Sequence, residues 1–262
     1  MLCKSFLLKL LLITPLFLSS QNPMLVTYSY QTNYGNFTSD LIYTNSESTF
    51  ILYNDKKGVG KVEQIDDEQV IYKINDNENE INAVYYTNQE SKYYTESVYS
   101  YKQAKVINVV DSVPELDWVI HSKNNKTILG YKCIKATTNY RGSDVVAYFS
   151  PDIPTKFGPY KFDGLPGLIL QIYDDSPNFM NQFTATEIVF NGKAQVVELS
   201  KGKNPISYEE FIIEHEIESE KRINETHKKL RANLPRDVKE SERTGLQRSG
   251  FEKIYEWEEE ED

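Results

Sequence analysis

Residues 131–149 read YKCIKATTNY-RGS-DVVAYF, and this stretch decides the fold. Two runs that suit β-strands, Tyr131–Tyr140 and Asp144–Phe149, flank the short polar turn Arg141-Gly142-Ser143. Tyr, Phe, Val, Ile and Thr side chains fit the half-buried surface of a pleated strand, and a short glycine-containing turn joins antiparallel strands. The sequence therefore predicts a β-hairpin at this place.

Comparable short runs continue on both sides of this hairpin. The other predicted strands are Met24–Tyr30, Asp40–Tyr43, Ser48–Tyr53, Gln69–Ile74, Ile81–Thr87, Lys92–Tyr99, Leu168–Tyr173 and Phe183–Phe190. Polar turns separate them, and no helix-length apolar stripe interrupts the series, which argues against alternating strands and helices. The predicted fold class is mainly β: a curved antiparallel sheet or half-barrel formed by residues 22–200.

The C-terminal part of the chain has a different composition. Ser207 followed by Glu210 is a capping box, which predicts a helix start. Sparse apolar residues among many charged ones then predict one exposed, charged helix over residues 205–234, which ends before Pro235. Residues 235–262 are polar and strongly acidic at the end, so we expect a mobile acidic tail there.

The N-terminus has the layout of a secretory signal peptide. Lys4 and Lys9 precede a short apolar run over residues 10–18, and the small residues Ser19 and Ser20 follow. The run is shorter than the ~20 apolar residues that cross a bilayer. We therefore predict a signal peptide over residues 1–20 and a mature chain without a membrane span; an uncleaved anchor is the alternative.

Charge and cysteine content exclude two further classes of protein. The formal net charge is −10 at pH 7, and an acidic chain does not attract nucleic-acid phosphates. Cys3 lies in the predicted signal peptide, so Cys133 stands alone in the mature chain and cannot form an internal disulfide. The exported protein must therefore be held together by its core.

The connection between the predicted hairpin and the next strand, residues 151–167, is rich in proline and glycine. Its prolines and glycines are Pro151, Pro154, Pro159, Pro166, Gly158, Gly164 and Gly167, and its aromatic residues are Phe157, Tyr160 and Phe162. Leu165-Pro166-Gly167-Leu168 predicts a type II turn, in which proline fixes φ near −65° and glycine supplies the positive φ that follows. We expect a stiff loop that a tight turn directs into the strand Leu168–Tyr173.

An ordered series of short motifs surrounds this turn. Its members are Leu129–Cys133, Asp152-Ile153-Pro154, Gly158–Phe162 and the hexapeptide Gly164-Leu165-Pro166-Gly167-Leu168-Ile169. Over residues 129–174 the series resembles the GLPGLI family of exported Bacteroidetes proteins, with Tyr148 where many members have Trp. The resemblance implies a signal peptide and a location in the periplasm or outer envelope of a Gram-negative bacterium. It implies no reaction and no cofactor, so no catalytic residue is carried over.

The residues on their own offer no convincing catalytic or metal-binding set. Cys133 would need a histidine nearby to act as a nucleophile, but it lies in mid-strand in phase with Tyr131, which favours a small buried core residue. His215-Glu216 starts like a zinc-protease helix, yet Ser219 stands where the second histidine ligand belongs. The Gly58-Val59-Gly60-Lys61 stretch lacks the spacing of a phosphate-binding loop and predicts a hairpin turn instead. We predict no catalytic residue, no metal and no cofactor.

These observations favour a non-catalytic envelope protein that binds an apolar ligand or a partner protein. A curved sheet can enclose an apolar ligand on its concave face. The predicted contact residues are Phe157, Tyr160, Phe162 and Leu165. The alternative role for these four residues is to plug one end of the sheet. Two other functions stay open: an accessory interaction protein that acts through the C-terminal helix, and an envelope hydrolase that uses Cys133.

Overall fold

The computed structural model describes residues 23–44, 47–53, 61–66, 69–73, 81–88, 93–177, 180–190, 205–232, 248 and 250–261. The predicted signal peptide and the turn predicted around Gly58 and Gly60 lie outside these residues. The elements in chain order are β1 (Met24–Thr32), β2 (Gly35–Thr44), β3 (Glu47–Tyr53), β4 (Lys61–Asp66), β5 (Gln69–Lys73), β6 (Ile81–Asn88), β7 (Tyr94–Ser100), β8 (Lys105–Asp111), β9 (Val119–Ile128), β10 (Tyr131–Tyr140), β11 (Ser143–Ser150), β12 (Leu168–Asp174), β13 (Asn181–Val189), β14 (Ile206–Ser207), α1 (Tyr208–Ala232) and the 3-10 helix η1 (Glu256–Glu261).

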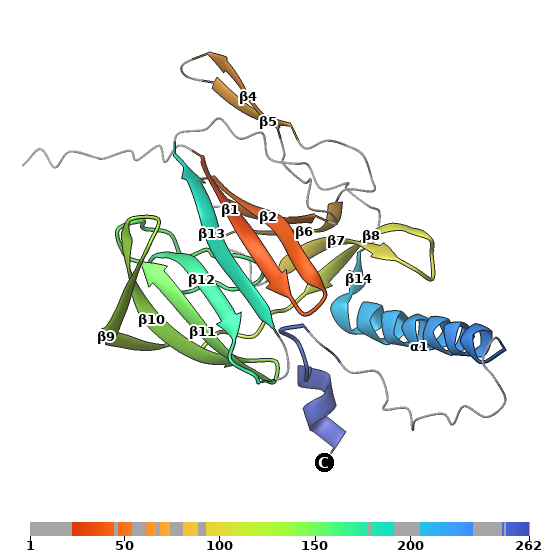
Figure 1. Ribbon diagram of the computed structural model, residues 1–262. Helices are drawn as coiled ribbons and strands as arrows, with labels where there is room; N and C mark the ends of the chain where they lie inside the picture. The colour runs from red at the N-terminus through yellow and green to blue at the C-terminus, as the bar shows by residue number, and fades with distance from the viewer. Residues whose placement is uncertain are drawn as a thin grey trace, which may run out of the picture.

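Twelve of the strands form one open sheet, in the order β14-β8-β7-β6-β3-β2-β1-β13-β12-β11-β10-β9. All neighbouring pairs are antiparallel except β14 and β8. Figure 1 shows that the sheet is strongly twisted and curved, with β9–β12 and β6–β8 on opposite sides of the central strands β1, β2 and β13. This arrangement confirms the predicted mainly-β class with one C-terminal helix, and because β9 and β14 are separate edges, the sheet is not a closed barrel.

The predicted hairpin forms the β10–β11 pair. Its turn residues Arg141 and Gly142 have φ values of 44° and 76°, which place both in the left-handed region. A two-residue turn with two positive φ values matches the right-handed twist of the flanking strands. Glycine accepts this conformation freely, whereas an arginine there is uncommon and points to a further role for its side chain.

The loop between β11 and β12, residues 151–167, fills the interior of the curved sheet. Phe157, Phe162 and Leu165 are all buried in the main core. The ring of Phe157 lies 5.6 Å from that of Tyr43 on β2, and the ring of Phe162 lies 5.1 Å from that of Tyr140 on β10. The loop therefore supplies core side chains that join both halves of the sheet.

The turn that ends this loop differs from the prediction at Gly167. Gly167 is not among the residues with positive φ; those in the loop are Tyr160, at 59°, and Gly164, at 88°. A Cβ atom at position 167 would instead lie 2.2 Å from the carbonyl oxygen of Ser150. The prediction of a type II turn with positive φ at Gly167 is therefore wrong. Position 167 requires glycine because two backbone segments approach each other closely there.

The helix α1 begins where the sequence predicts. The backbone NH of Glu210 donates to Ser207 Oγ at 3.1 Å, which is the expected N-cap hydrogen bond. Beyond the helix, the described part of the C-terminal segment differs from the expected mobile tail, since Phe251, Glu252 and Tyr255 are buried. Three buried residues hardly change the composition of a long polar stretch, so the sequence did not indicate that this part of the chain is packed against the fold.

Replacing Gly167 with Ala should destabilise the protein by about 1–3 kcal/mol, because the new methyl group meets backbone that has little room to move. The matched control is Gly250→Ala, where the nearest atom to the added Cβ is the Glu252 nitrogen at 3.9 Å. Guanidinium unfolding of both variants measures the difference. Equal midpoints for the two variants would contradict the close-approach role.

Candidate functional site

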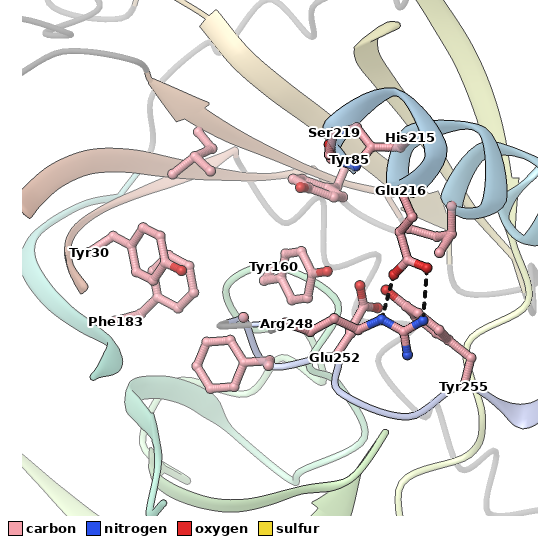
Figure 2. A pocket seen from close by; sticks show the side chains of 14 residues that line it. Tyr30, Tyr85, Tyr160, Phe183, His215, Glu216, Ser219, Arg248, Glu252 and Tyr255 are labelled. Carbon is pink, nitrogen blue, oxygen red and sulfur yellow. Dashed lines mark hydrogen bonds and ion pairs between the residues drawn. The ribbon is translucent and has the colours of Figure 1, made fainter. Parts of the chain in front are cut away.

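A pocket of about 380 Å³ lies between α1, the C-terminal segment and the concave face of the sheet (Figure 2). Its lining residues are Tyr30, Leu52, Tyr85, Tyr160, Phe183, Ile212, His215, Glu216, Ser219, Arg248, Gly250, Phe251, Glu252 and Tyr255. They come from β1, β3, β6, β13, the 151–167 loop, α1 and the end of the chain. Segments far apart in the sequence therefore build one concave site.

One wall of the pocket is an uninterrupted row of aromatic rings, which we call the aromatic row: Tyr30, Phe183, Phe251, Tyr160 and Tyr85. The stacked rings of Tyr30 and Phe183 are 4.1 Å apart, and Phe183 and Phe251 are 6.0 Å apart and nearly parallel. Phe251 continues to Tyr160 at 6.3 Å, and Tyr160 meets Tyr85 edge-on at 4.9 Å. Such a wall presents flat apolar faces with phenolic hydroxyls at intervals.

The opposite side of the pocket is polar, and its arginine is paired with two carboxylates. The Arg248 guanidinium donates to Glu216 at 2.6 and 3.1 Å and to Glu258 at 2.8 and 2.7 Å. Figure 2 shows the Arg248–Glu216 contacts, which tie the C-terminal segment to α1. Burial lowers the pKa of His215, so this ring is neutral at neutral pH. The pocket therefore has polar groups at one side without a large excess of charge.

Directly behind the pocket lies a buried ionic cluster, formed by Lys161, Arg141, Glu96, Asp111 and Glu252. Lys161 Nζ lies 2.5 Å from Glu96, 2.6 Å from Asp111 and 3.1 Å from Glu252. Arg141 contacts Asp111 at 2.8 Å and Glu252 at 2.5 Å. Two cations therefore face three buried carboxylates, and Glu252 belongs to both the cluster and the pocket wall.

Each member of the ionic cluster comes from a different segment. Lys161 lies in the 151–167 loop, Arg141 at the tip of the β10–β11 hairpin, Glu96 in β7, Asp111 at the end of β8 and Glu252 in the C-terminal segment. Charges removed from water need partners and further hydrogen bonds to offset their lost hydration. The cluster consequently fixes the positions of all five segments relative to one another.

The two glutamates of the cluster have opposite pKa shifts. Burial raises the pKa of Glu96 to about 7. The nearby Lys161 ammonium lowers this pKa, and the Glu252 and Asp111 carboxylates raise it and so offset part of the effect of Lys161. Burial acts on Glu252 as well, but Lys161, Arg141 and the hydroxyls of Tyr140 and Tyr208 lower its pKa to about 2. Glu252 is therefore ionised at every ordinary pH, whereas Glu96 changes its charge near neutrality.

The four predicted contact residues have two different locations. Tyr160 lines the pocket, while Phe157, Phe162 and Leu165 lie in the core and do not line it. The burial of these three residues fits the alternative role, in which they plug one end of the sheet. Direct contact with a ligand stays a prediction for all four and has a structural basis at Tyr160.

Among the described histidine side chains, neither His121 nor His215 lies against Cys133. Cys133 is fully buried in β10, as its mid-strand position predicted, and burial raises the pKa of its thiol. His121 Nε2 is hydrogen-bonded to Thr137 at 2.9 Å, and His215 packs against Phe211. Within the described residues no contact joins Cys133 to these rings, so the arrangement lacks a base and an accessible thiolate.

Comparisons with known proteins agree with the fold and leave the activity open. Residues 138–171 match the sequence model of a family described as "Protein of unknown function (Porph_ging)". No curated protein matches the chain. None of the helices among the described residues is long and apolar enough to span a membrane.

Several solved structures resemble the chain. PNGF-II in a P21 crystal form has a TM-score of 0.51 at 14% identity, with 74% of this chain and 33% of that chain covered. PNGF-II in a C2 form has a TM-score of 0.47 at 15% identity, with 74% and 32% covered. The MucA/MucB complex of Pseudomonas aeruginosa has a TM-score of 0.32 at 10% identity, with 65% and 52% covered. The chain thus spans about a third of the PNGF-II chains, and only the P21 form supports a shared fold.

Lys161→Met should destabilise the protein by about 3–5 kcal/mol, because it leaves three buried carboxylates with one cation. Lys132→Met is the matched control, since Lys132 is exposed on β10 and its replacement should cost less than about 0.5 kcal/mol. Chemical unfolding of both variants at pH 7 measures the effect. A similar loss in both would mean that the cluster does not depend on its lysine.

Glu96 should make the protein less stable as the pH rises through neutrality. Its pKa in the folded state, about 7, lies above the ordinary value of 4.5, so the folded state binds this proton more tightly. The resulting stabilisation is present below about pH 4.5 and is lost as the pH rises through 7; its size is of the order of 1–3 kcal/mol. Glu252 has the opposite sign, but its effect lies below pH 4.5.

The test is the free energy of unfolding at pH 5, 6, 7 and 8 for the parent and for Glu96→Gln, which stays neutral. The parent should lose stability across this range, and the variant should lose distinctly less. Parallel curves for the two proteins would show that Glu96 does not titrate in this window.

Proposed function

We propose that this chain is an exported envelope protein that binds a small apolar ligand, without catalysis, in the pocket between α1, the C-terminal segment and the sheet. The observation that carries the proposal is the aromatic row, which faces a pocket of about 380 Å³. Ligand sites are typically concave, mainly apolar, and about 300–1,000 Å³ in volume, with a few placed polar groups.

The shape of the pocket favours a ligand with a flat or ring-shaped apolar part. Such a part would stack on Phe183, Phe251 and Tyr160, whose faces form the wall. A polar end would reach His215 and Ser219 on α1. Since Arg248 is already paired with Glu216 and Glu258, a neutral ligand fits better than a strongly charged one.

The cellular location in this proposal rests on sequence. Its support is the predicted signal peptide over residues 1–20 and the resemblance of residues 129–174 to exported envelope proteins. We assign the periplasm or outer envelope of a Gram-negative bacterium as the place of action.

A second candidate function is partner binding through α1. Ile213 and Ile217 are 48% and 62% exposed on an otherwise charged helix, and they are one helical turn apart. A pair of exposed isoleucines at this spacing suits contact with a partner protein. This supports the alternative that the chain is an accessory protein which acts through its C-terminal helix. The buried thiol of Cys133 gives the hydrolase alternative no comparable support.

Ser219→Trp should weaken binding of the neutral fluorophore N-phenyl-1-naphthylamine at least tenfold, because the indole would occupy the pocket from α1. Ile213→Trp, which adds the same group on the exposed side of this helix, should leave binding unchanged. Fluorescence titration measures both, with thermal unfolding to show that the fold is retained.

Two results would contradict the ligand-binding proposal. One is equal fluorophore binding by the parent and Ser219→Trp. The other combines two observations. Native mass spectrometry of the protein, purified from the periplasm without detergent, shows no bound molecule, and the parent protein does not bind the fluorophore.

A further inference from the structure

The C-terminal segment, Arg248 with residues 250–258, is held by the rest of the chain in the way that a bound peptide is held. The ring of Phe251 enters a slot between three rings: Phe162 at 5.0 Å, Phe183 at 6.0 Å and Tyr160 at 6.3 Å. The side chain is buried there although its neighbour Gly250 is exposed. The fold thus offers a shaped aromatic slot to a single residue of this segment.

Next to this slot, four donors converge on the carboxylate of Glu252. Tyr140 Oη donates at 2.7 Å, Arg141 Nη1 at 2.5 Å and Lys161 Nζ at 3.1 Å, all to Oε1, while Tyr208 Oη donates to Oε2. Charge-assisted hydrogen bonds of this kind are the stronger and more specific ones in proteins. All four donors are supplied by parts of the chain outside the C-terminal segment.

The backbone after Glu252 is also recognised. The Arg141 carbonyl accepts hydrogen bonds from the NH groups of Lys253, at 2.8 Å, and Ile254, at 3.0 Å. The Lys253 ammonium donates to Asp174 at 2.6 Å. Slot, carboxylate donors and carbonyl together form what we call the segment seat.

The charges of the ionic cluster balance when the segment is removed, and Asp174, which then loses Lys253, keeps its hydrogen bonds from the backbone NH and the hydroxyl of Ser176. Lys161 and Arg141 would then face Glu96 and Asp111, two cations against two carboxylates, at the contact distances given above. A seat that keeps its charges paired can stay folded while empty. Occupation by Glu252 adds one buried negative charge, so the segment is an addition to a complete network.

We propose that the segment seat is a peptide-binding site for a Phe–Glu pair, occupied here by the chain's own C-terminal segment, and that the same segment of a second copy can replace it. A second copy offers every contact of the first, so the exchange loses no hydrogen bond or ring contact. Because the segment also forms one wall of the ligand pocket, its exchange opens and closes that pocket.

The experiment begins with the complete folded chain, which carries an inserted site for a sequence-specific protease between residues 240 and 241. After cleavage, the fragment that ends at Asp262 should co-elute with the body on size exclusion. A fluorescent peptide of residues 248–262 should then displace the fragment and be retained by the body. The control peptide carries F251E and E252F together, which keeps the composition, and should bind at least tenfold more weakly.

Two outcomes would overturn the proposal. A fragment that stays bound and excludes a hundredfold excess of the peptide is a fixed part of the fold. A body that releases the fragment and then binds both peptides equally has no site for the Phe–Glu pair.

A second variant covers the case in which the cleaved protein unfolds. The uncut chain with Glu252→Ala loses the anchor of its own segment and keeps a balanced seat. It should bind the labelled peptide at least tenfold more tightly than the parent chain, in which the intact segment competes. A folded Glu252→Ala variant that does not bind the peptide contradicts the proposal.

Discussion

The ammonium group of Lys161, which is fully buried, sets the constraint on which the rest of this structure depends. An unpaired charge in a protein interior costs far more free energy than a domain of this size can supply. Its partners Glu96, Asp111 and Glu252 come from β7, β8 and the end of the chain. The loop that carries Lys161 can therefore occupy the interior of the sheet only if carboxylates from neighbouring segments pair with it; Glu96 on β7 and Asp111 on β8 do so from the sheet itself, and Glu252 adds a third.

This constraint explains why the pocket lies where it does. Once Glu252 is bound in the ionic cluster, its neighbours Phe251 and Tyr255 are placed within a few residues of it and become walls of the pocket. Buried ion networks add little net stability compared with apolar packing, but they restrict which arrangements are possible. The cluster thus acts mainly on geometry, and the aromatic row supplies the apolar surface that favours ligand binding.

The sequence predicted the parts of this structure whose signals are local. Alternation of side chains predicted β1, the turn at Arg141-Gly142 predicted the β10–β11 hairpin, and Ser207 with Glu210 predicted the start of α1. The strand β9 was missed because its side chains are mostly exposed and follow no apolar alternation. The ionic cluster could not be predicted, because Lys161 and Glu252 are 91 residues apart and neither lies in a pattern that marks it as buried.

The stretch that matches the known family, residues 138–171, includes both cations of the cluster, Arg141 and Lys161. The three carboxylates of the cluster lie outside it, in β7, in β8 and in the C-terminal segment. A chain that has a lysine and an arginine at these two places must supply carboxylates from elsewhere, since two buried cations cannot remain unpaired. A short matching stretch therefore restricts the rest of this fold through charge balance.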